Sequence, residues 1–328
     1  MMESLKRFIR KKFINESHPF LWSLWFSRNE LRAWSNHERH KRMSYAEIEA
    51  EISAEYECLF GRKLNWNNPQ TYNEKINVSK LYMATPEKTR LADKYLVREW
   101  IREKIGEEYL IPLLGVYDSF DEIDFDSLPD KFVIKCNHDC GSVTLVSNKS
   151  KINVKILKRK YDFYPRRNFA YLKHEMQYRD IKPRIIIEQY MGDAISDYKF
   201  QCFNGKPYSC RIDYDRFGDH RRNVYNMNWE ILPFMKGDYK HTEYDCPCPP
   251  EYDDMKRIVH KLSEGFEQVR VDLYLIDGRI YFGEMTFTNG SGFEVFVPDE
   301  WDYKLGELWP FDNTIRRKIL SEHSRPEN

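Results

Sequence analysis

Apolar residues recur at helical spacing through the first third of the chain. Ser44 with Glu47, and Thr71 with Glu74, have the spacing of a helix capping box, and each pair precedes such an apolar pattern. A third helix is expected after Thr85, because the proline that follows it suits the first position of a helix. The pattern therefore predicts that the first third is helical.

Beyond residue 108 the helical period gives way to short runs of β-branched and aromatic residues, which predict strands. Asn204-Gly205 and Asp277-Gly278 are dipeptides typical of two-residue turns, so each predicts an antiparallel hairpin. Helical spacing returns once, at residues 250–268. Four earlier strands are expected within residues 109–117, 131–135, 143–147 and 184–190.

These elements predict an α+β fold. A length of 328 residues fits about two domains, and the chain shows no internal repeat and no long linker. The expected parts are a helical N-terminal region and three successive parts of a β-rich body, at residues 1–64, 65–130, 131–183 and 184–328.

The charge balance argues against a nucleic-acid partner. Fifty-two Lys and Arg residues match 52 Asp and Glu residues, so the chain has no overall field that would attract a polyanion. The first 43 residues are an exception, with ten Lys or Arg against four Glu. Within them, the basic and aromatic residues 1–26 could rest on a membrane surface, although a packed helix explains the same pattern.

The seven cysteines indicate reduced thiols, because the number is odd and a chain of this length does not depend on disulfides. Their spacings include no CxxC pair, so a structural zinc site is not expected. The longest strongly apolar stretch is far shorter than the roughly 20 residues that cross a bilayer. We therefore expect a cytoplasmic protein, in which the N-terminal segment would make any contact with the inner face of the membrane.

The segment at residues 131–146 predicts a strand, a polar loop and a second strand. Lys135 ends the first strand, and His138, Gly141 and Ser142 lie in the loop. Backbone N–H groups of a Gly/Ser loop can bind phosphate oxygens, and the lysine adds a positive charge. A plain hairpin with a lysine at its base explains the same residues. The chain contains neither GxxxxGK nor GxGxxG.

The hairpin around Asp277-Gly278 carries three charged residues that are expected to lie together. Arg270 and Asp272 share one face of the first strand, and Glu284 on the return strand can lie near Asp272. Facing carboxylates repel unless a cation lies between them, and Mg²⁺ is commonly held by one or two carboxylates plus substrate phosphates. The alternative is a solvated face on which Arg270 is the counter-ion.

Four features occur in order along the chain: Lys94 in the third expected helix, Lys135 with its loop, the strand end at 188–191, and the hairpin with Arg270. This order resembles that of the ATP-grasp ligases. The segments NPQTYNEKI, ADKYLVR, FVIKCNHDCGSV, IIIEQYMGD with DYKFQCFNGKP, and VRVDLYLIDGRIYFGEMTFTNGSG are similar to one branch. That branch is the TupA-like ATP-grasp proteins, which are associated with teichuronopeptide and other surface-polysaccharide biosynthesis. The resemblance covers residues 65–305.

The resemblance implies an ATP-grasp fold, in which two β-rich lobes clasp ATP. It implies that Lys94 and Lys135 bind the ATP phosphates and that loop 137–143 closes over them. Residues 188–191 would bind the adenine and the ribose. The expected ATP-binding residues are Lys94, Lys135, His138, Gly141, Ser142, Glu188, Gln189, Tyr190, Met191 and Lys199.

The resemblance also implies a Mg²⁺ ion on Asp272 and Glu284. It implies that Arg270, together with Lys135, stabilises the charge on the transferring phosphoryl group. Thr286 stands where Asn is usual in ATP-grasp sites, so Thr286 would be a weaker neutral oxygen ligand. The expected substrate-binding residues are Arg211, Asp213, Asn289, Gly290 and Ser291.

The implied reaction is an ATP-dependent ligation of a carboxylate to an amine through an acylphosphate, with ADP as by-product. For the TupA-like branch the carboxylate would be a hexuronic acid of a surface polysaccharide, and the amine an amino acid or peptide. The alternative enzyme is a glycosyltransferase, because Asp124-Phe125-Asp126 and Asp213-Tyr214-Asp215 are DxD motifs. A third hypothesis is a non-catalytic adaptor that docks through its basic N-terminus.

Overall fold

The computed structural model describes residues 30, 32–192, 195–214, 221–237 and 246–323. The basic and aromatic segment 1–26 lies outside the described residues. The chain divides into two compact units, each assembled from separate stretches of sequence. Unit 1 comprises residues 1–43, 112–173 and 181–190, and unit 2 comprises residues 44–111, 174–180 and 191–328.

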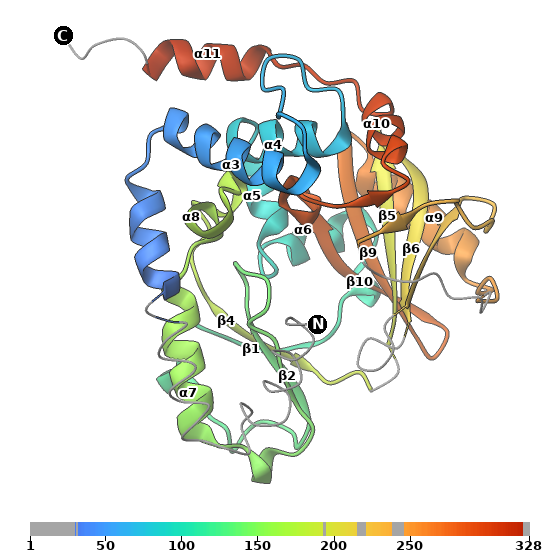
Figure 1. Cartoon of the computed structure of the whole chain (residues 1–328). Helices are drawn as coiled ribbons and strands as arrows, with labels where there is room; N and C mark the ends of the chain where they lie inside the picture. The colour runs from blue at the N-terminus through green and yellow to red at the C-terminus, as the bar shows by residue number, and fades with distance from the viewer. Residues whose placement is uncertain (1–29, 31, 193–194, 215–220, 238–245, 324–328) are drawn as a thin grey trace. The chain divides into compact units, whose positions relative to one another are not determined.

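Unit 1 is built on a four-stranded antiparallel sheet with the strand order β1-β4-β2-β3 (Figure 1). The strands are β1 (Leu113–Tyr117), β2 (Phe132–Cys136), β3 (Thr144–Val146) and β4 (Ile185–Gln189). All four expected strands are confirmed. The first is shorter than the apolar run 109–117 that predicted it, since Tyr109 ends a 3-10 turn and the strand begins at Leu113.

The two faces of this sheet differ in character, because alternate side chains of a strand point to opposite faces. Ile134 of β2 and Ile187 of β4 belong to one apolar cluster with Leu157 of α7 (Val154–Phe163). Lys135 and Glu188 alternate with these residues and therefore lie on the opposite face. Unit 1 also contains α8 (Phe169–Lys173) and a helix at residues 32–41.

The first helices of unit 2 follow the predicted capping signals. Ser44 and Glu47 form a capping box at the start of α3 (Tyr45–Phe60), and Thr71 with Glu74 forms another at the start of α4 (Tyr72–Tyr82). Every residue of α4 is buried.

The expectation of one continuous helix after Thr85 is wrong. The structure contains α5 (Pro86–Ala92) and α6 (Val97–Lys104), separated by a turn. The carboxylate of Asp93 accepts hydrogen bonds from the backbone N–H groups of Tyr95 (2.8 Å) and Leu96 (3.2 Å), and these bonds favour a turn over a continued helix. Lys94 therefore lies in the turn and not on a helix.

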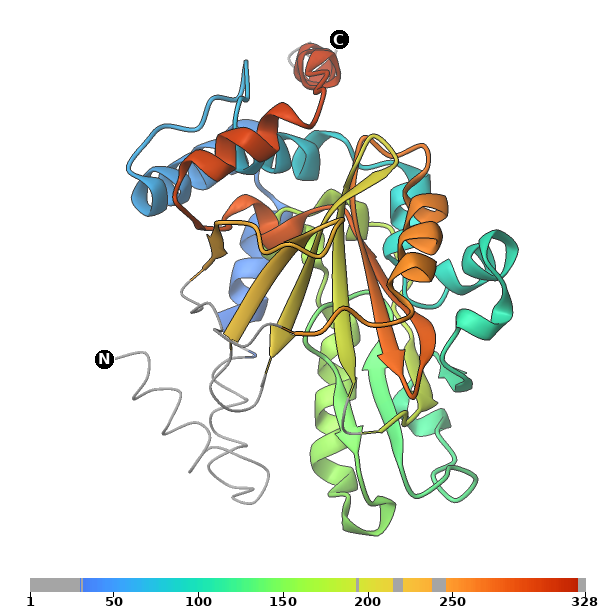
Figure 2. The same cartoon turned by 90° about the vertical axis from the view of Figure 1, so that its right-hand side faces the viewer.

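Unit 2 is built on a five-stranded antiparallel sheet with the order β10-β9-β5-β6-β7 (Figure 2). Asn204-Gly205 and Asp277-Gly278 form its two tight turns with positive φ angles, so both predicted hairpins are confirmed. The strands are β5 (Ser196–Phe203), β6 (Lys206–Tyr214), β7 (Arg221–Asn226), β9 (Gln268–Ile276) and β10 (Arg279–Thr286).

One face of this sheet is apolar and the other is charged. Phe200 of β5 and Val271 of β9 pack in one cluster with Met255 and Leu262 of α9 (Tyr252–Ser263), which confirms the helix expected in residues 250–268. The residues that alternate with this cluster include the charged residues discussed below.

Strand β7 was not predicted, and neither were the remaining strands and helices of unit 2. They are a two-stranded sheet and two C-terminal helices: β8 (Met235–Lys236), β11 (Phe296–Val297), α10 (Glu300–Glu307) and α11 (Thr314–His323). In the described part of the chain, no helix has the length and apolar character needed to cross a membrane. All seven cysteines are free thiols.

Candidate active site

Lys135 and Glu188 form an ion pair on the polar face of the sheet in unit 1. The Lys135 Nζ lies 2.6 Å from a Glu188 carboxylate oxygen. The pairing of β2 with β4 produces this contact, since Lys135 lies opposite Ile186 and Glu188 lies opposite Val133. The structure thus brings together the strand lysine and the acidic residue of the strand end 188–191.

The loop that follows β2 is anchored at its beginning and exposed at its tip. Asn137 accepts a 2.6 Å hydrogen bond from the backbone N–H of Arg184, and its own backbone N–H donates to the Arg184 carbonyl. Gly141 is exposed and has a φ of 98°, a backbone conformation that favours glycine. The exposed positions at the tip offer backbone N–H groups of the kind that bind anions.

His138 and Ser142 are buried within the same loop. The Ser142 hydroxyl accepts a hydrogen bond from the backbone N–H of Cys136 (2.8 Å) and donates to the carboxylate of Asp139. A ring nitrogen of His138 lies 3.0 Å from the carbonyl oxygen of Arg167. Both side chains therefore hold the shape of the loop, and their assignment to ATP stays a prediction.

Arg167 lies outside the loop in the sequence and forms an ion pair with Asp139 within it. One guanidinium nitrogen lies 2.8 Å from an Asp139 carboxylate oxygen, and the guanidinium stacks on the ring of Tyr164 at 4.4 Å. The Asp139 side chain is fully buried, so this ion pair is protected from solvent. Removal of one partner from a buried pair is strongly destabilising. Arg167 is therefore a positioning residue for loop 137–143.

The strand end 188–191 spans the boundary between the two units. Gln189 is exposed, and its backbone N–H donates to the Pro112 carbonyl at 2.9 Å. The Lys131 ammonium lies 5.7 Å from the centre of the Tyr190 ring. Tyr190 is the last residue of unit 1 in this segment, and Met191 begins the next stretch of unit 2.

The charged hairpin of unit 2 is centred on Arg270. Its Nε lies 2.6 Å from one Asp272 carboxylate oxygen, and its Nη2 lies 2.8 Å from the other oxygen. The same Nη2 lies 2.6 Å from Glu284, which is directly opposite Asp272 in the pairing of β10 with β9. The predicted proximity of the three residues is confirmed. Thr286 donates a 2.9 Å hydrogen bond to Glu284.

Lys199 extends this network to the next strand. Its ammonium lies 2.7 Å from Asp272 and 2.6 Å from Asp197, and all three side chains are buried. Burial alone would raise the pKa of Asp272, but Arg270 and Lys199 more than offset this and hold it well below its ordinary value. The Asp272 carboxylate and the Arg270 guanidinium therefore stay charged throughout the physiological pH range.

Arg211 occupies a different kind of position on the same face. Its closest carboxylate contacts among the described residues are with Asp213 at 3.8 Å and Glu294 at 3.7 Å, both beyond hydrogen-bond distance. Burial, with repulsion by Arg270 and Arg222, lowers the pKa of Arg211. A buried guanidinium of this kind can donate to an added anion.

Lys236 and Arg222 bind the two carboxylates next to Arg211. The Lys236 ammonium lies 2.7 Å from Glu294, and the Arg222 Nε lies 2.6 Å from Asp213. Burial lowers the pKa of Lys236 to about 8, although Glu294 opposes the shift. The charge on Lys236 is therefore sensitive to pH near neutrality.

The predicted substrate turn lies at residues 289–292. Gly290 and Ser291 both have positive φ angles, and the Ser291 carbonyl accepts a 2.8 Å hydrogen bond from the buried Lys80 ammonium. Asn289 is buried, and its side-chain amide donates to Gln201 of β5. The turn is therefore held by two elements of unit 2, α4 and β5.

Comparison with known protein families identifies the family of the chain. A family model, TupA-like ATP-grasp, matches residues 74–309. The chain belongs to the TupA-like ATP-grasp family. No curated protein matches the sequence. The family match confirms the expected α+β ATP-grasp fold.

Several solved structures are similar to this TupA-like protein at low sequence identity. D-alanine–D-alanine ligase from Bacillus anthracis is 15% identical, with a TM-score of 0.39 over 71% of this chain and 67% of that chain. The same ligase complexed with ATP is 16% identical, with a TM-score of 0.36 over 61% and 54%. N5-carboxyaminoimidazole synthetase from Staphylococcus aureus is 13% identical, with a TM-score of 0.34 over 60% and 44%. The chain thus spans about half to two thirds of these proteins.

The donor set of the TupA-like protein suits Mg²⁺. Asp272 and Glu284 supply the hard carboxylate oxygens that Mg²⁺ prefers, from directly opposed positions. The Asn289 side-chain oxygen is buried without a hydrogen-bond partner among the described residues, so it is a neutral oxygen available in the same unit. Thr286 makes its hydroxyl contact with Glu284. Thr286 and Asn289 are therefore the two candidates for a third, neutral oxygen ligand.

Sequence reasoning missed five residues that contact either loop 137–143 or the predicted substrate-binding residues of unit 2 and their neighbours. They are Lys80, Arg167, Arg222, Lys236 and Glu294. Glu294 follows the 289–292 turn by two residues, and this position could have drawn attention to it. No local signal marks Arg167, because its partner Asp139 lies 28 residues away in the sequence.

Proposed function

We propose that this protein is an ATP- and Mg²⁺-dependent carboxylate–amine ligase that releases ADP. The observation that carries the proposal is the arrangement of Arg270 with Asp272 and Glu284 on paired strands, in a chain of the TupA-like ATP-grasp family. Phosphoryl transfer depends mainly on positioning and on charge stabilisation, and these residues supply both.

The residues have separate tasks in this proposal. Lys135 and Lys94 bind phosphate oxygens, and the exposed tip of loop 137–143 adds backbone donors. Asp272 and Glu284 hold Mg²⁺, which lowers the cost of bringing charged phosphates together. Arg270 stabilises charge on the transferring phosphoryl group. The γ-phosphoryl group passes from ATP to an oxygen of the substrate carboxylate, which gives an acylphosphate and ADP. The amine then attacks the acyl carbon, displaces inorganic phosphate and loses a proton to give the amide.

The carboxylate substrate is proposed to be a hexuronic acid of a cell-surface polysaccharide, and the amine an amino acid or peptide. Arg211 supports a carboxylate substrate, since its side chain is only 13% exposed and its carboxylate contacts among the described residues, with Asp213 and Glu294, are both longer than a hydrogen bond. Residues 289–291 are proposed as further contacts with the acceptor. We propose that the ligase acts in the cytoplasm, at the inner face of the membrane.

The first test is thermal unfolding with Mg-ATP and, separately, with Mg-UDP-sugars. A ligand at 100 times its Kd stabilises a protein by about 2.7 kcal/mol. Mg-ATP is expected to stabilise the wild type and to have little effect on Asp272→Asn. Stabilisation by a UDP-sugar with indifference to ATP would instead support a glycosyltransferase. The two DxD motifs give that alternative little support, because Asp124 and Asp126 lie in an exposed turn and Asp213 is paired with Arg222.

The second test measures ADP release with paired panels of uronic acids and amino acids. Release should require one member of each panel and should be lost in Lys135→Met. Arg211→Ala should keep the stabilisation by ATP and lose ligation, because Arg211 is assigned to the carboxylate substrate. An Arg211→Ala variant with wild-type ligation would remove Arg211 from the site. Full cellular activity in Lys135→Met would favour the non-catalytic adaptor.

A further inference from the structure

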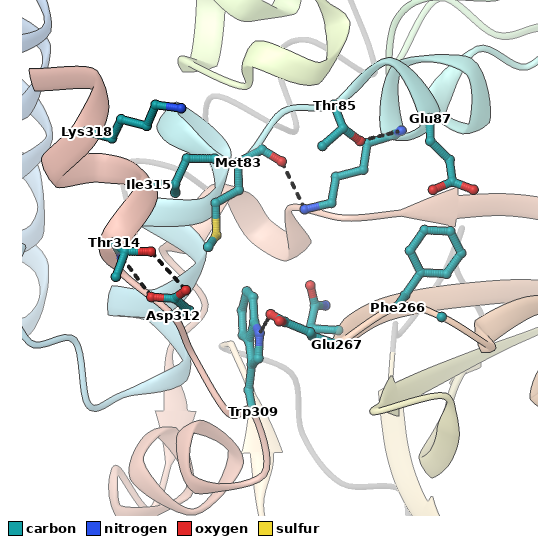
Figure 3. Close-up of a pocket in the computed structure, with 13 residues that line it drawn as sticks. Met83, Thr85, Glu87, Phe266, Glu267, Trp309, Asp312, Thr314, Ile315 and Lys318 are labelled. Atoms are coloured by element: carbon teal, nitrogen blue, oxygen red, sulfur yellow. Dashed lines mark hydrogen bonds between the residues drawn. The ribbon is translucent and has the colours of Figure 1, made fainter. Parts of the chain in front are cut away.

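A cavity of about 650 Å³ lies within unit 2, and none of the residues assigned to ligation lines it. Three segments form its wall: residues 83–88 from the end of α4 into α5, residues 265–268 up to the start of β9, and the stretch from Trp309 into α11 (Figure 3). A volume of this size suits a small organic molecule. The cavity is therefore a candidate binding site separate from the charged face around Arg270.

Lys88 supplies a positive charge to this cavity. Its ammonium has three N–H donors, and the one hydrogen bond it makes among the described residues is to the Met83 carbonyl at 3.0 Å. It forms no ion pair there with any carboxylate. Burial lowers the pKa of Lys88, and Glu267 opposes the shift. The ammonium lies 5.9 Å from the Phe287 ring. Such a cation can bind a carboxylate with the donors that remain.

Glu267 supplies a negative charge on another part of the wall. The indole N–H of Trp309 donates to one carboxylate oxygen of Glu267 at 3.1 Å. Glu267 forms no ion pair among the described residues. In Figure 3 the Glu267 carboxylate lies beside the Trp309 ring, and Phe266 lies next to it along the chain. An ammonium group of a ligand could therefore pair with Glu267.

The other wall residues narrow the chemistry of the ligand. Met83, Phe266 and Ile315 give the cavity apolar surface. Three carboxylates line it, from Glu87, Glu267 and Asp312, against two ammonium groups, from Lys88 and Lys318. This balance disfavours a polyanion such as a nucleotide. It suits a molecule that carries one charge of each sign together with an apolar group.

We propose that this cavity binds a zwitterion with an apolar side chain, either a free α-amino acid or a dipeptide. Its carboxylate pairs with Lys88, its ammonium pairs with Glu267, and its side chain packs between Met83 and Phe266. The proposal does not depend on the ligation chemistry assigned to the charged face.

Calorimetric titration of the full-length protein, without nucleotide, tests the proposal. L-phenylalanine and L-alanyl-L-phenylalanine distinguish a free amino acid from a dipeptide, and at least one should bind. Hydrocinnamate lacks the ammonium and phenethylamine lacks the carboxylate, so each should bind at least about tenfold more weakly than L-phenylalanine, or not at all. These comparisons use the wild-type protein and therefore do not depend on the folding of a variant.

Two variants assign the charges. Lys88→Met should weaken binding of the zwitterion about tenfold or more, and so should Glu267→Gln, while Lys261→Met, an exposed lysine of α9, should bind as the wild type does. Both cavity variants should keep the stabilisation by Mg-ATP, which separates this site from the ligation site. The proposal is overturned if neither zwitterion binds at millimolar concentration, or if Lys88→Met and Glu267→Gln bind as tightly as the wild type.

Discussion

Replacement of Arg270 by Met should destabilise unit 2, because it leaves two opposed carboxylates without their shared partner. Arg270 makes three short contacts with Asp272 and Glu284, at 2.6, 2.8 and 2.6 Å. The Asp272 side chain is 2% exposed, whereas that of Glu284 is 38% exposed. Water can therefore screen Glu284, and most of the cost arises at Asp272.

The size of the effect follows from what Asp272 retains. Removing one partner of a buried ion pair costs about 3–5 kcal/mol. Asp272 keeps its 2.7 Å contact with Lys199, so we expect the lower end of that range, about 3 kcal/mol. Methionine fills much of the space of the arginine stem, which limits any additional loss from packing.

Urea denaturation at pH 7, followed by tryptophan fluorescence, measures this loss. Arg279→Met is the matched control, because Arg279 is exposed at the start of the same strand, β10, and should change stability by less than about 0.5 kcal/mol. A loss below about 1 kcal/mol in Arg270→Met would refute the reasoning that Asp272 depends on Arg270.

The pH dependence provides an independent check. The depressed pKa of Asp272 contributes stability above the ordinary pKa of an aspartate, 3.8, and this contribution disappears as the pH falls through the native value. The difference between wild type and Arg270→Met should therefore be largest near neutral pH and should shrink below about pH 4. A difference that stays constant from pH 7 to pH 3 would point to lost packing instead of lost charge pairing.

Three further predictions concern Lys135, Arg167 and Lys236. Lys135→Met should weaken Mg-ATP binding by at least about tenfold in equilibrium titration, whereas Lys155→Met, at an exposed lysine of α7, should change it by less than about threefold. Arg167→Met should speed hydrogen exchange in loop 137–143, because the buried Asp139 loses its partner; unchanged exchange would show that the loop is held without it. ADP release should fall as the pH rises through about 8, where Lys236 loses its proton, and Lys236→Arg should flatten that decline; equal profiles for both proteins would exclude Lys236 as the cause.

Local sequence chemistry accounts for the parts of the fold that could be predicted. The turns at Asn204-Gly205 and Asp277-Gly278 need positive φ angles, and these residue types adopt such angles readily. The period of two then places Asp272 on the face opposite Val271, whichever strands become its neighbours. Arg270, Asp272 and Glu284 could be brought together from the sequence because they belong to a single hairpin.

Features that depend on distant contacts or on a single side chain could not be predicted in this way. The apolar spacing of residues 91–101 continues through Asp93, and only the hydrogen bonds from Asp93 to the following N–H groups reveal the break before α6. Lys236 lies on the two-residue strand β8, which is too short to show any period. The 3.7 Å contact between Arg211 and Glu294 joins residues more than 80 positions apart.

The contacts of the charged face also indicate the order in which its ligands should bind. Both oxygens of Asp272 are engaged by Arg270 and Lys199, so a metal ion that binds there must displace existing charge pairs. Such a displacement is costly in a buried site, where an unpaired charge is poorly solvated. Nucleotide phosphates would supply oxygen ligands to Mg²⁺ and, at the same time, new partners for the displaced cations. Mg²⁺ alone should therefore bind weakly, and Mg²⁺ with ATP should bind far more tightly than either component by itself.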